Sequence, residues 1–272
     1  MILGIIAGNR NLPLLLTQRI KQDNSQIKTV VIAFKGETKK EIVKSADKVC
    51  WLEVGKLGQL AETLQKENIS ECIMIGQINP LRIFNQKNWD EELLRVVKKA
   101  CDFRPHAIFS QIITYLEDRG ITFLDSTLYL KSDLASQGVM NDITVGQKQN
   151  QDIEFGLKMI SKYVELDLGQ TLAVKAGSVV ALESLEGTDN TIKRAYNLAS
   201  KGITILKFSK HNQDLRFDVP VVGISTLKLL KRIKAKSLIL ESNKVIILNK
   251  SEFLKKAREW GIAVIGREKL SS

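Results

Sequence analysis

The amino-acid sequence predicts an α/β chain with two domains, an N-terminal Rossmann-like parallel sheet and a C-terminal α/β domain. Short apolar runs of strand length alternate with segments of helical period along most of the chain. This pattern dissolves into Ser, Asp, Gly, Asn and Gln over residues 125–149, where we expect the domain linkage. With 272 residues, of which 44% are hydrophobic, the chain can bury two cores. We therefore place the domains at residues 1–130 and 145–272.

The first half alternates strands with helices. Residues 2–7 predict a first strand, and the polar loop at 8–11 leads to a helix with Pro13 in its first turn. Further strands are expected at 29–34, 48–52, 71–75 and 121–124, and further helices at 38–46, 57–67, 90–101 and 105–119. Asp102, between the last two helices, either caps the second of them or points toward a ligand.

Two loops of this half are candidates for ligand binding. One follows the first strand and contains Gly8 and Asn9, and the other follows the 71–75 strand and contains Gly76, Gln77 and Asn79. Open parallel sheets bind ligands at the carboxyl ends of their strands, so we expect both loops to face one crevice. The first loop has a single glycine and therefore lacks the G-x-G-x-x-G dinucleotide fingerprint.

The second half is also predicted to be α/β. A helix at 151–163 precedes two strands at 171–175 and 178–182, which Ala176-Gly177 joins as a tight hairpin. Further strands are expected at 203–207, 237–240, 245–248 and 262–265, and helices at 191–198, near 228–236 and at 251–260. Ahead of the 191–198 helix, Thr188 or Asp189 simply caps the helix, or the helix start beside Gly187 receives a phosphate.

The densest group of mixed charges lies in the segment 213–223, which contains Asp214, Arg216 and Asp218. Pro220 and the valines around it favour a strand or a loop that leads into one. In a strand, residues two apart share a face, and the two carboxylates would be separated by about 13 Å. One would then hold a metal or orient water while the other fixes Arg216. A row of surface salt bridges explains the same residues.

Composition narrows the choice of partner. The net charge of +11 fits nucleic acid, an anionic membrane surface or an anionic substrate. Only 6% of residues are aromatic, and no basic run is interleaved with aromatics, which argues against a nucleic-acid partner. The predicted basic helix, with Lys228, Lys231 and Arg232, offers a surface to anionic lipid, although a solvated helix face explains the same pattern.

The remaining signals concern location and metal chemistry. No apolar stretch approaches the roughly 20 residues of a membrane span, and the first residues lack the basic region of a secretory signal, so we expect a cytoplasmic protein. Cys50, Cys72 and Cys101 are isolated and fit reduced thiols. Two histidines are too few for a histidine-rich centre, so any metal should be a hard cation held by oxygen, magnesium or manganese.

Several short motifs, taken together and in order, resemble one known family. They are Ile6-Ala7-Gly8 with Leu12-Pro13, Asp167-Leu168-Gly169-Gln170, Glu186-Gly187-Thr188-Asp189, and Lys210-His211-Asn212-Gln213-Asp214-Leu215-Arg216-Phe217-Asp218-Val219-Pro220-Val221-Val222-Gly223. The family is that of the UDP-2,3-diacylglucosamine pyrophosphatases of lipid A biosynthesis, in the form unrelated to calcineurin-like phosphoesterases. The resemblance covers essentially the full length of the chain.

This resemblance implies a magnesium-dependent hydrolase that splits UDP-2,3-diacylglucosamine into UMP and 2,3-diacylglucosamine 1-phosphate. It also implies a homodimer, peripheral on the cytoplasmic face of the inner membrane, with the substrate between the two domains. Asp218 matches the essential acid of the family, Asp214 and Arg216 are the further catalytic candidates, and the two aspartates are the candidate metal ligands. The candidate substrate-binding residues are Gly8, Asn9, Leu12, Gly76, Gln77, Asn79, Asp102, Gln170, Glu186, Thr188, Asp189, Lys210 and Gln213.

The sequence departs from the family pattern at three places. Its N-terminal loop reads Asn9-Arg10-Asn11 instead of a glycine-rich sequence, and Cys101-Asp102 and Val221-Val222 replace other pairs. These changes concern the sugar contacts more than the pyrophosphate site. The competing hypothesis is a non-catalytic nucleotide-sugar or lipid-binding protein, against which the presence of Asp214, Arg216 and Asp218 argues.

Overall fold

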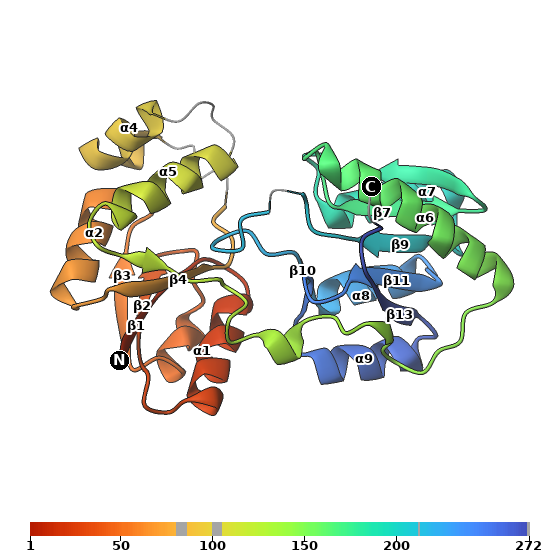
Figure 1. Cartoon of the computed structure of the whole chain (residues 1–272), viewed down its shortest axis with the longest axis horizontal. Coiled ribbons are helices and arrows are strands. Elements are labelled where there is room, and N and C mark those ends of the chain that lie inside the picture. Colours follow the sequence, from red (N-terminus) through yellow and green to blue (C-terminus); the bar gives the residue numbers. More distant parts are fainter. Residues whose placement is uncertain (80–85, 100–104, 212, 271–272) are drawn as a thin grey trace. The chain divides into compact units, whose positions relative to one another are not determined.

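The computed structural model describes residues 1–79, 86–99, 105–211 and 213–270. The chain forms two compact units (Figure 1). The first unit comprises Met1–Leu130 and Leu215–Asp218, and the second comprises Lys131–Asp214 and Val219–Ser272. The predicted domain ranges did not include this return of the segment Leu215–Asp218 to the first unit.

The first unit is built on a parallel sheet with the strand order β3-β2-β1-β4-β5 (Figure 1). Its strands are β1 (Ile2–Ala7), β2 (Lys28–Phe34), β3 (Lys48–Leu52), β4 (Glu71–Ile75) and β5 (Thr122–Phe123). The central strands are buried along nearly their whole length, which explains their continuous apolar runs. The order confirms the predicted Rossmann-like sheet, in which the loops after β1 and β4 flank the switch point.

Helices cover both faces of this sheet. They are α1 (Leu12–Asp23), α2 (Leu57–Lys66), α4 (Glu91–Lys98) and α5 (Pro105–Glu117), with the short 3-10 helices η1 (Lys40–Lys44) and η2 (Gln86–Asn88). Ile6 of β1 joins the core formed with α2, α4 and α5. Its neighbour Ile5 is also fully buried and points to the opposite face, where α1 buries Leu16 and Ile20.

The predicted helix at 38–46 is wrong, because the chain there forms only the short η1. Thr38 Oγ1 donates to Ala7 O (2.5 Å) and accepts from Phe34 N (2.9 Å), which holds the chain in a turn instead. Beyond η1, Asp47 Oδ2 accepts from both the N–H (2.8 Å) and the hydroxyl (2.9 Å) of Thr29. The backbone hydrogen bond from Thr29 lowers the pKa of Asp47, which therefore stabilises the start of β2 in its charged form.

The second unit contains a mixed sheet with the order β6-β13-β11-β9-β7-β8 and a separate β10-β12 pair. Its strands are β6 (Gly138–Val139), β7 (Thr171–Lys175), β8 (Ser178–Leu182), β9 (Thr204–Lys207), β10 (Val221–Val222), β11 (Ser237–Glu241), β12 (Ile246–Ile247) and β13 (Ala263–Arg267). Strands β9, β11 and β13 are parallel, and β6, β7 and β8 are antiparallel to their neighbours. The very short β6 was not predicted.

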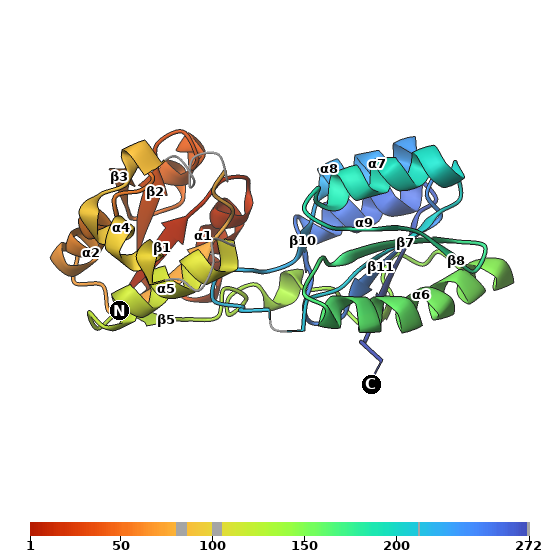
Figure 2. The same cartoon turned by 90° about the horizontal axis from the view of Figure 1, so that it is seen from above.

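Helices cover both faces of this second sheet, α6 on one side and α7, α8 and α9 on the other (Figure 2). They are α6 (Gln147–Glu165), α7 (Thr188–Ala199), α8 (Ile224–Arg232) and α9 (Lys250–Glu259), with the 3-10 helix η3 (Lys131–Asp133) ahead of them. Separate cores form beneath α6 and beneath the other three helices. The β7–β8 hairpin is confirmed: Ala176 (φ 51) and Gly177 (φ 70) both have the positive φ of a type I′ turn.

Candidate functional site

The loops after β1 and β4 meet at the carboxyl-end edge of the first sheet. Gly8 N donates to Ile75 O (2.8 Å) and Asn9 N donates to Gln77 O (2.6 Å). A Cβ on Gly8 would lie 2.4 Å from Gln77 O, so glycine is required for the two backbones to approach this closely. Gly76, with φ +91, also needs the freedom of glycine. The structure therefore brings together four of the five predicted residues of these two loops, Gly8, Asn9, Gly76 and Gln77.

Glu37 joins the same two loops to the loop after β2. Its carboxylate is buried, and Oε2 accepts from Asn9 Nδ2 (2.9 Å) and from Asn79 N (3.1 Å). The sequence analysis missed Glu37, although an acid shortly after the second strand of a parallel sheet was a usable signal. Leu12, by contrast, buries its side chain in α1, where it contributes to the core.

A buried lysine organises the carboxyl-end edge of the second sheet. Lys207, the last residue of β9, is 4% exposed, and its Nζ donates to Thr188 Oγ1 (2.7 Å). Thr188 Oγ1 also lies 3.1 Å from Thr171 Oγ1 and 3.3 Å from each carboxylate oxygen of Glu183. A buried ammonium group requires such polar partners. The sequence analysis placed Thr188 in the site but missed the lysine and Glu183.

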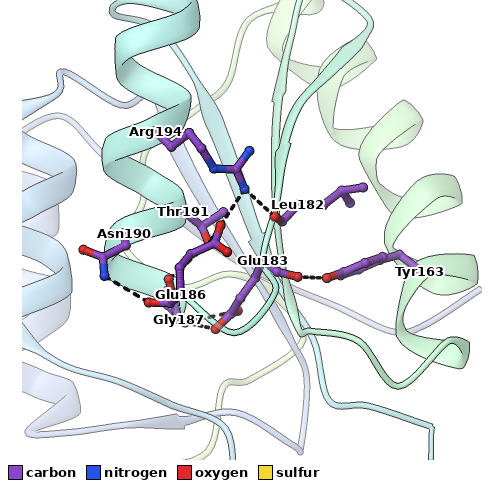
Figure 3. A network of polar contacts seen from close by, with 9 residues as sticks. Tyr163, Leu182, Glu183, Glu186, Gly187, Asn190, Thr191 and Arg194 are labelled. Carbon is purple, nitrogen blue, oxygen red and sulfur yellow. Dashed lines mark hydrogen bonds and ion pairs between the residues drawn. The ribbon is translucent and has the colours of Figure 1, made fainter.

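Figure 3 shows Glu186 directed back toward helix α7. Its Oε1 accepts from Arg194 (2.5 Å) and from Thr191 Oγ1 (3.2 Å), while Arg194 also donates to Leu182 O (2.7 Å). The hydrogen bond from Arg194 lowers the pKa of Glu186, so the carboxylate stays charged and paired. The side chain of Glu186, which was predicted to bind substrate, therefore makes its contacts with the adjacent helix α7.

Helix α7 begins at Thr188, one position after Gly187, which is the N-cap and has φ +79. The prediction of Thr188 or Asp189 as the N-cap is therefore wrong. The Asp189 carboxylate instead accepts from Thr226 Oγ1 (3.3 Å), which joins α7 to α8. Gly187 contributes no side chain to the cap, and its freedom at positive φ explains why glycine stands in this motif.

The Asp-x-Gly-Gln motif packs against the same edge. A Cβ on Gly169 would lie 2.2 Å from Glu183 O and 2.4 Å from the Tyr163 hydroxyl, so glycine is needed there. The Tyr163 hydroxyl donates to Glu183 O, and burial raises the pKa of Tyr163 to about 12 (Figure 3). Asp167 forms an ion pair with Lys210 Nζ (3.4 Å), which joins this motif to the Asp-Arg-Asp motif.

Three of the predicted ligand amides have a buried atom without a hydrogen-bond partner in the structure described. These atoms are Asn9 Oδ1, Gln170 Oε1 and Gln213 Nε2, and Gln149 Nε2 has the same property outside the predicted site. The other amide atom of Gln213 accepts from Lys210 N (2.8 Å), so this side chain is held in one orientation. Unsatisfied buried groups are rare in folded proteins, and three of the four in the described residues belong to side chains predicted to bind substrate.

The segment Leu215–Asp218 packs on the first unit as a turn, so the predicted strand geometry is wrong here. Ser126 N donates to Leu215 O (2.9 Å), and Ser126 Oγ donates to Arg216 O (2.9 Å). The Arg216 guanidinium lies 2.9 Å from Glu117 Oε1, and the Phe217 ring packs 5.1 Å from that of His106. The single shared strand face inferred for Asp214, Arg216 and Asp218 therefore does not apply, whereas the alternative prediction, a loop that leads into a strand, is confirmed by β10.

The two candidate metal ligands belong to different units, Asp214 to the second and Asp218 to the first. Within the described ranges, no three His, Cys, Asp or Glu side chains come together as a metal-binding group. Asp102 and Cys101 lie outside the described residues. Cys50 and Cys72 are free thiols, and burial raises the pKa of Cys72 to about 12.

The basic segment near residues 228–236 begins in the amphipathic helix α8, as predicted, but α8 ends at Arg232, so Lys234 and Lys236 lie beyond it. Leu227, Leu230 and Ile233 are buried in the core of the second unit. The charged side chains are exposed, and Lys231 Nζ lies 4.5 Å from the centre of the Trp260 ring. The described part of the chain has no helix with the length and apolar content to cross a membrane.

Comparison with known proteins assigns both halves of the chain to one family. The LpxI N-terminal domain family matches residues 2–132, and the LpxI C-terminal domain family matches residues 136–265. The UDP-2,3-diacylglucosamine pyrophosphatase LpxI of Caulobacter vibrioides is 21% identical over 275 residues, which cover 97% of this chain and 96% of that protein.

Solved structures offer only weak similarity. The biotin carboxylase subunit of pyruvate carboxylase is 13% identical, with a TM-score of 0.28, over 85% of this chain and 41% of that chain. Phosphoribosylglycinamide synthetase from Anaerococcus prevotii is 11% identical, with a TM-score of 0.23, over 74% of this chain and 43% of that chain. This chain spans less than half of either protein, and both TM-scores are low.

Proposed function

Because this chain belongs to the LpxI family, we propose that it hydrolyses UDP-2,3-diacylglucosamine to UMP and 2,3-diacylglucosamine 1-phosphate in lipid A biosynthesis. The observation that carries this proposal is the match of both family domains, in order, over residues 2–132 and 136–265. The near-complete mutual coverage with the Caulobacter vibrioides enzyme supports it.

The reaction requires little covalent chemistry from the protein. A water oxygen bonds to one phosphorus, the bridging oxygen leaves with the other phosphate, and a water proton is released. The protein must therefore position the water and neutralise charge on the phosphates. We assign the orientation and deprotonation of water to Asp218 and charge neutralisation to Arg216.

The contacts of Arg216 suit this role. Glu117 holds one guanidinium nitrogen at 2.9 Å, and Ser126 holds the backbone of the same residue, so the side chain is anchored at two points. A guanidinium carries five N–H donors in a fixed fork, so an anchored arginine can still present donors to phosphate oxygens. Lys210, which belongs to the second unit and pairs with Asp167, is the second candidate cation of the motif.

The chemistry of the donor set fits a hard cation. Asp214 and Asp218 offer carboxylate oxygens, and magnesium commonly binds one or two carboxylates together with substrate phosphate oxygens and water. When bound, Mg²⁺, or Mn²⁺ as the alternative, would neutralise charge on the pyrophosphate. Asp214 and Asp218 are the residues that would hold it.

We further place the protein at the cytoplasmic face of the inner membrane, where its lipid substrate resides. The apolar side of α8 is buried in its own unit, so attachment would be electrostatic, through the exposed basic side chains that follow Gly223. The homodimer and the position of the substrate between the domains stay predictions from the family resemblance.

The test is product analysis with purified protein, UDP-2,3-diacylglucosamine and Mg²⁺. We expect equimolar UMP and 2,3-diacylglucosamine 1-phosphate, and loss of turnover when a chelator is added. Release of UDP instead of UMP would show cleavage at the glycosidic bond and contradict the proposal. Binding of the substrate without turnover under any divalent cation would favour the non-catalytic binding protein.

A further inference from the structure

Glu37 is the point where three loops of the first sheet converge. It follows β2, and the same carboxylate oxygen accepts from the Asn9 side chain after β1 and from the backbone of Asn79 after β4. With the sheet order β3-β2-β1-β4-β5, these loops share one carboxyl-end edge. Glu37 therefore holds the loops after β1 and β4 in position at this edge, although none of the sequence motifs includes it.

The hydrogen bond to Glu37 also decides which end of the Asn9 amide faces inward. A carboxylate oxygen can only accept, so the amide must turn its Nδ2 toward Glu37. Its Oδ1 then points elsewhere and is buried without a hydrogen-bond partner in the structure described. Leaving such an acceptor unsatisfied costs about 1–3 kcal/mol, which a bound donor would recover.

The chemistry of this acceptor restricts what can bind to it. The pyrophosphate of a nucleotide sugar is ionised, so its oxygens carry no proton and only accept hydrogen bonds. They therefore cannot donate to Asn9 Oδ1. A donor group of the ligand can, and a sugar hydroxyl is such a donor, as is an N–H group. In Rossmann-type sheets with this strand order, an acid near the carboxyl end of the second strand commonly binds sugar hydroxyls.

We propose that Asn9 Oδ1 accepts a hydrogen bond from a ring hydroxyl of the substrate, and that Glu37 is the positioning residue that holds the amide in the required orientation. The inference rests on the proposed function, which supplies two candidate rings, the ribose of the nucleotide and the glucosamine of the lipid. It assigns to the first unit the recognition of a neutral hydroxyl rather than of the pyrophosphate.

The test compares ligands that differ by one hydroxyl, by calorimetry, with protein already shown to hydrolyse the substrate. One arm compares UMP with 2′-deoxy-UMP and with 3′-deoxy-UMP. The other compares 2,3-diacylglucosamine 1-phosphate with its 4-deoxy and 6-deoxy analogues. In one arm the wild-type protein should bind the hydroxylated ligand about tenfold more tightly than the deoxy ligand, because the deoxy ligand lacks one hydrogen bond. The arm that shows the preference identifies the ring.

Glu37→Met separates this role from a merely structural one when it is compared with Glu37→Gln. Methionine removes the acceptor that orients the Asn9 amide, so the tenfold preference should fall, whereas glutamine keeps an oxygen that can accept from both Asn9 Nδ2 and Asn79 N and should retain the preference. A purely structural role predicts lower stability and equal weakening of both ligands in a pair. Asn9→Leu should also remove the preference, and Glu41→Gln, at an exposed acid of η1, should leave it unchanged.

A preference of the wild type that survives both Asn9→Leu and Glu37→Met would overturn the inference. So would the absence of any preference in both arms. Because the wild-type protein is first required to release UMP, neither result would be confused with a failure of the proposed function.

Discussion

Replacing Gly8 by alanine tests how closely the two loops of the first sheet are packed. The added Cβ would lie 2.4 Å from Gln77 O, 2.7 Å from Gly76 C and 2.8 Å from Gln77 C, all of them backbone atoms. An ordinary carbon–oxygen contact is about 3.3 Å or longer, so the loops would have to separate by about 1 Å. Overpacking of this kind costs about 1–3 kcal/mol, and loss of the hydrogen bond from Asn9 N adds about 1 kcal/mol.

We therefore expect Gly8→Ala to lower the free energy of unfolding by about 2–4 kcal/mol, and the melting temperature by about 10 °C, in thermal and urea denaturation. The matched control is Gly58→Ala in α2, where the added Cβ meets only side-chain atoms at 3.3 Å or more. That change should be neutral or stabilise by about 0.5–1 kcal/mol, because alanine favours a helix over glycine. A stability of Gly8→Ala within about 0.5 kcal/mol of the wild type would refute the reasoning.

Three further predictions concern charged residues. Asp47→Ala should lower stability by about 1–2 kcal/mol near neutral pH. Folding lowers the pKa of Asp47, so the stability difference between wild type and variant should be complete at pH values above the unfolded-state pKa near 3.8. It should fade as the pH falls through the folded-state pKa, which urea denaturation at a series of pH values measures. Lys207→Met should cost about 2 kcal/mol, whereas Lys201→Met, at an exposed site, should not; equal effects would contradict the role of the buried amine. Glutamine at Lys228, Lys231 and Arg232 together should weaken binding to anionic vesicles about a hundredfold in flotation assays, and unchanged flotation would exclude α8.

Local physics was sufficient to predict much of the fold. The strands β1 and β4 have the predicted bounds, because short apolar runs covered on both faces leave a clear signal. The partly buried edge strand β3 also has the predicted bounds. The β7–β8 hairpin followed from Ala176-Gly177, since two residues at positive φ define the turn. Strand β6 was missed because two residues carry no periodicity.

The candidate site was harder, since its residues are held by partners far away in the sequence. Pro220 and the valines predicted an extended chain, but hydrogen bonds from Ser126 hold Leu215–Asp218 in a turn on the first unit. The pairing of Arg216 with Glu117 spans 99 positions, which no local pattern could reveal. Lys207 was counted as the end of a strand, and only the fold showed that its amine is buried.

The most direct test of the whole account is the turnover of Asp218→Ala, measured as UMP release from UDP-2,3-diacylglucosamine alongside equilibrium binding of the same lipid. Asp218 directly follows the turn at Leu215–Phe217, whose backbone Ser126 holds, so the turn should stay in place after the substitution. Loss of a general acid–base group lowers turnover by about 10²–10⁴-fold, and displacement of a metal lowers it further. We predict a loss of at least about 10²-fold with the lipid still bound, and turnover within a few fold of the wild type would contradict the assignment.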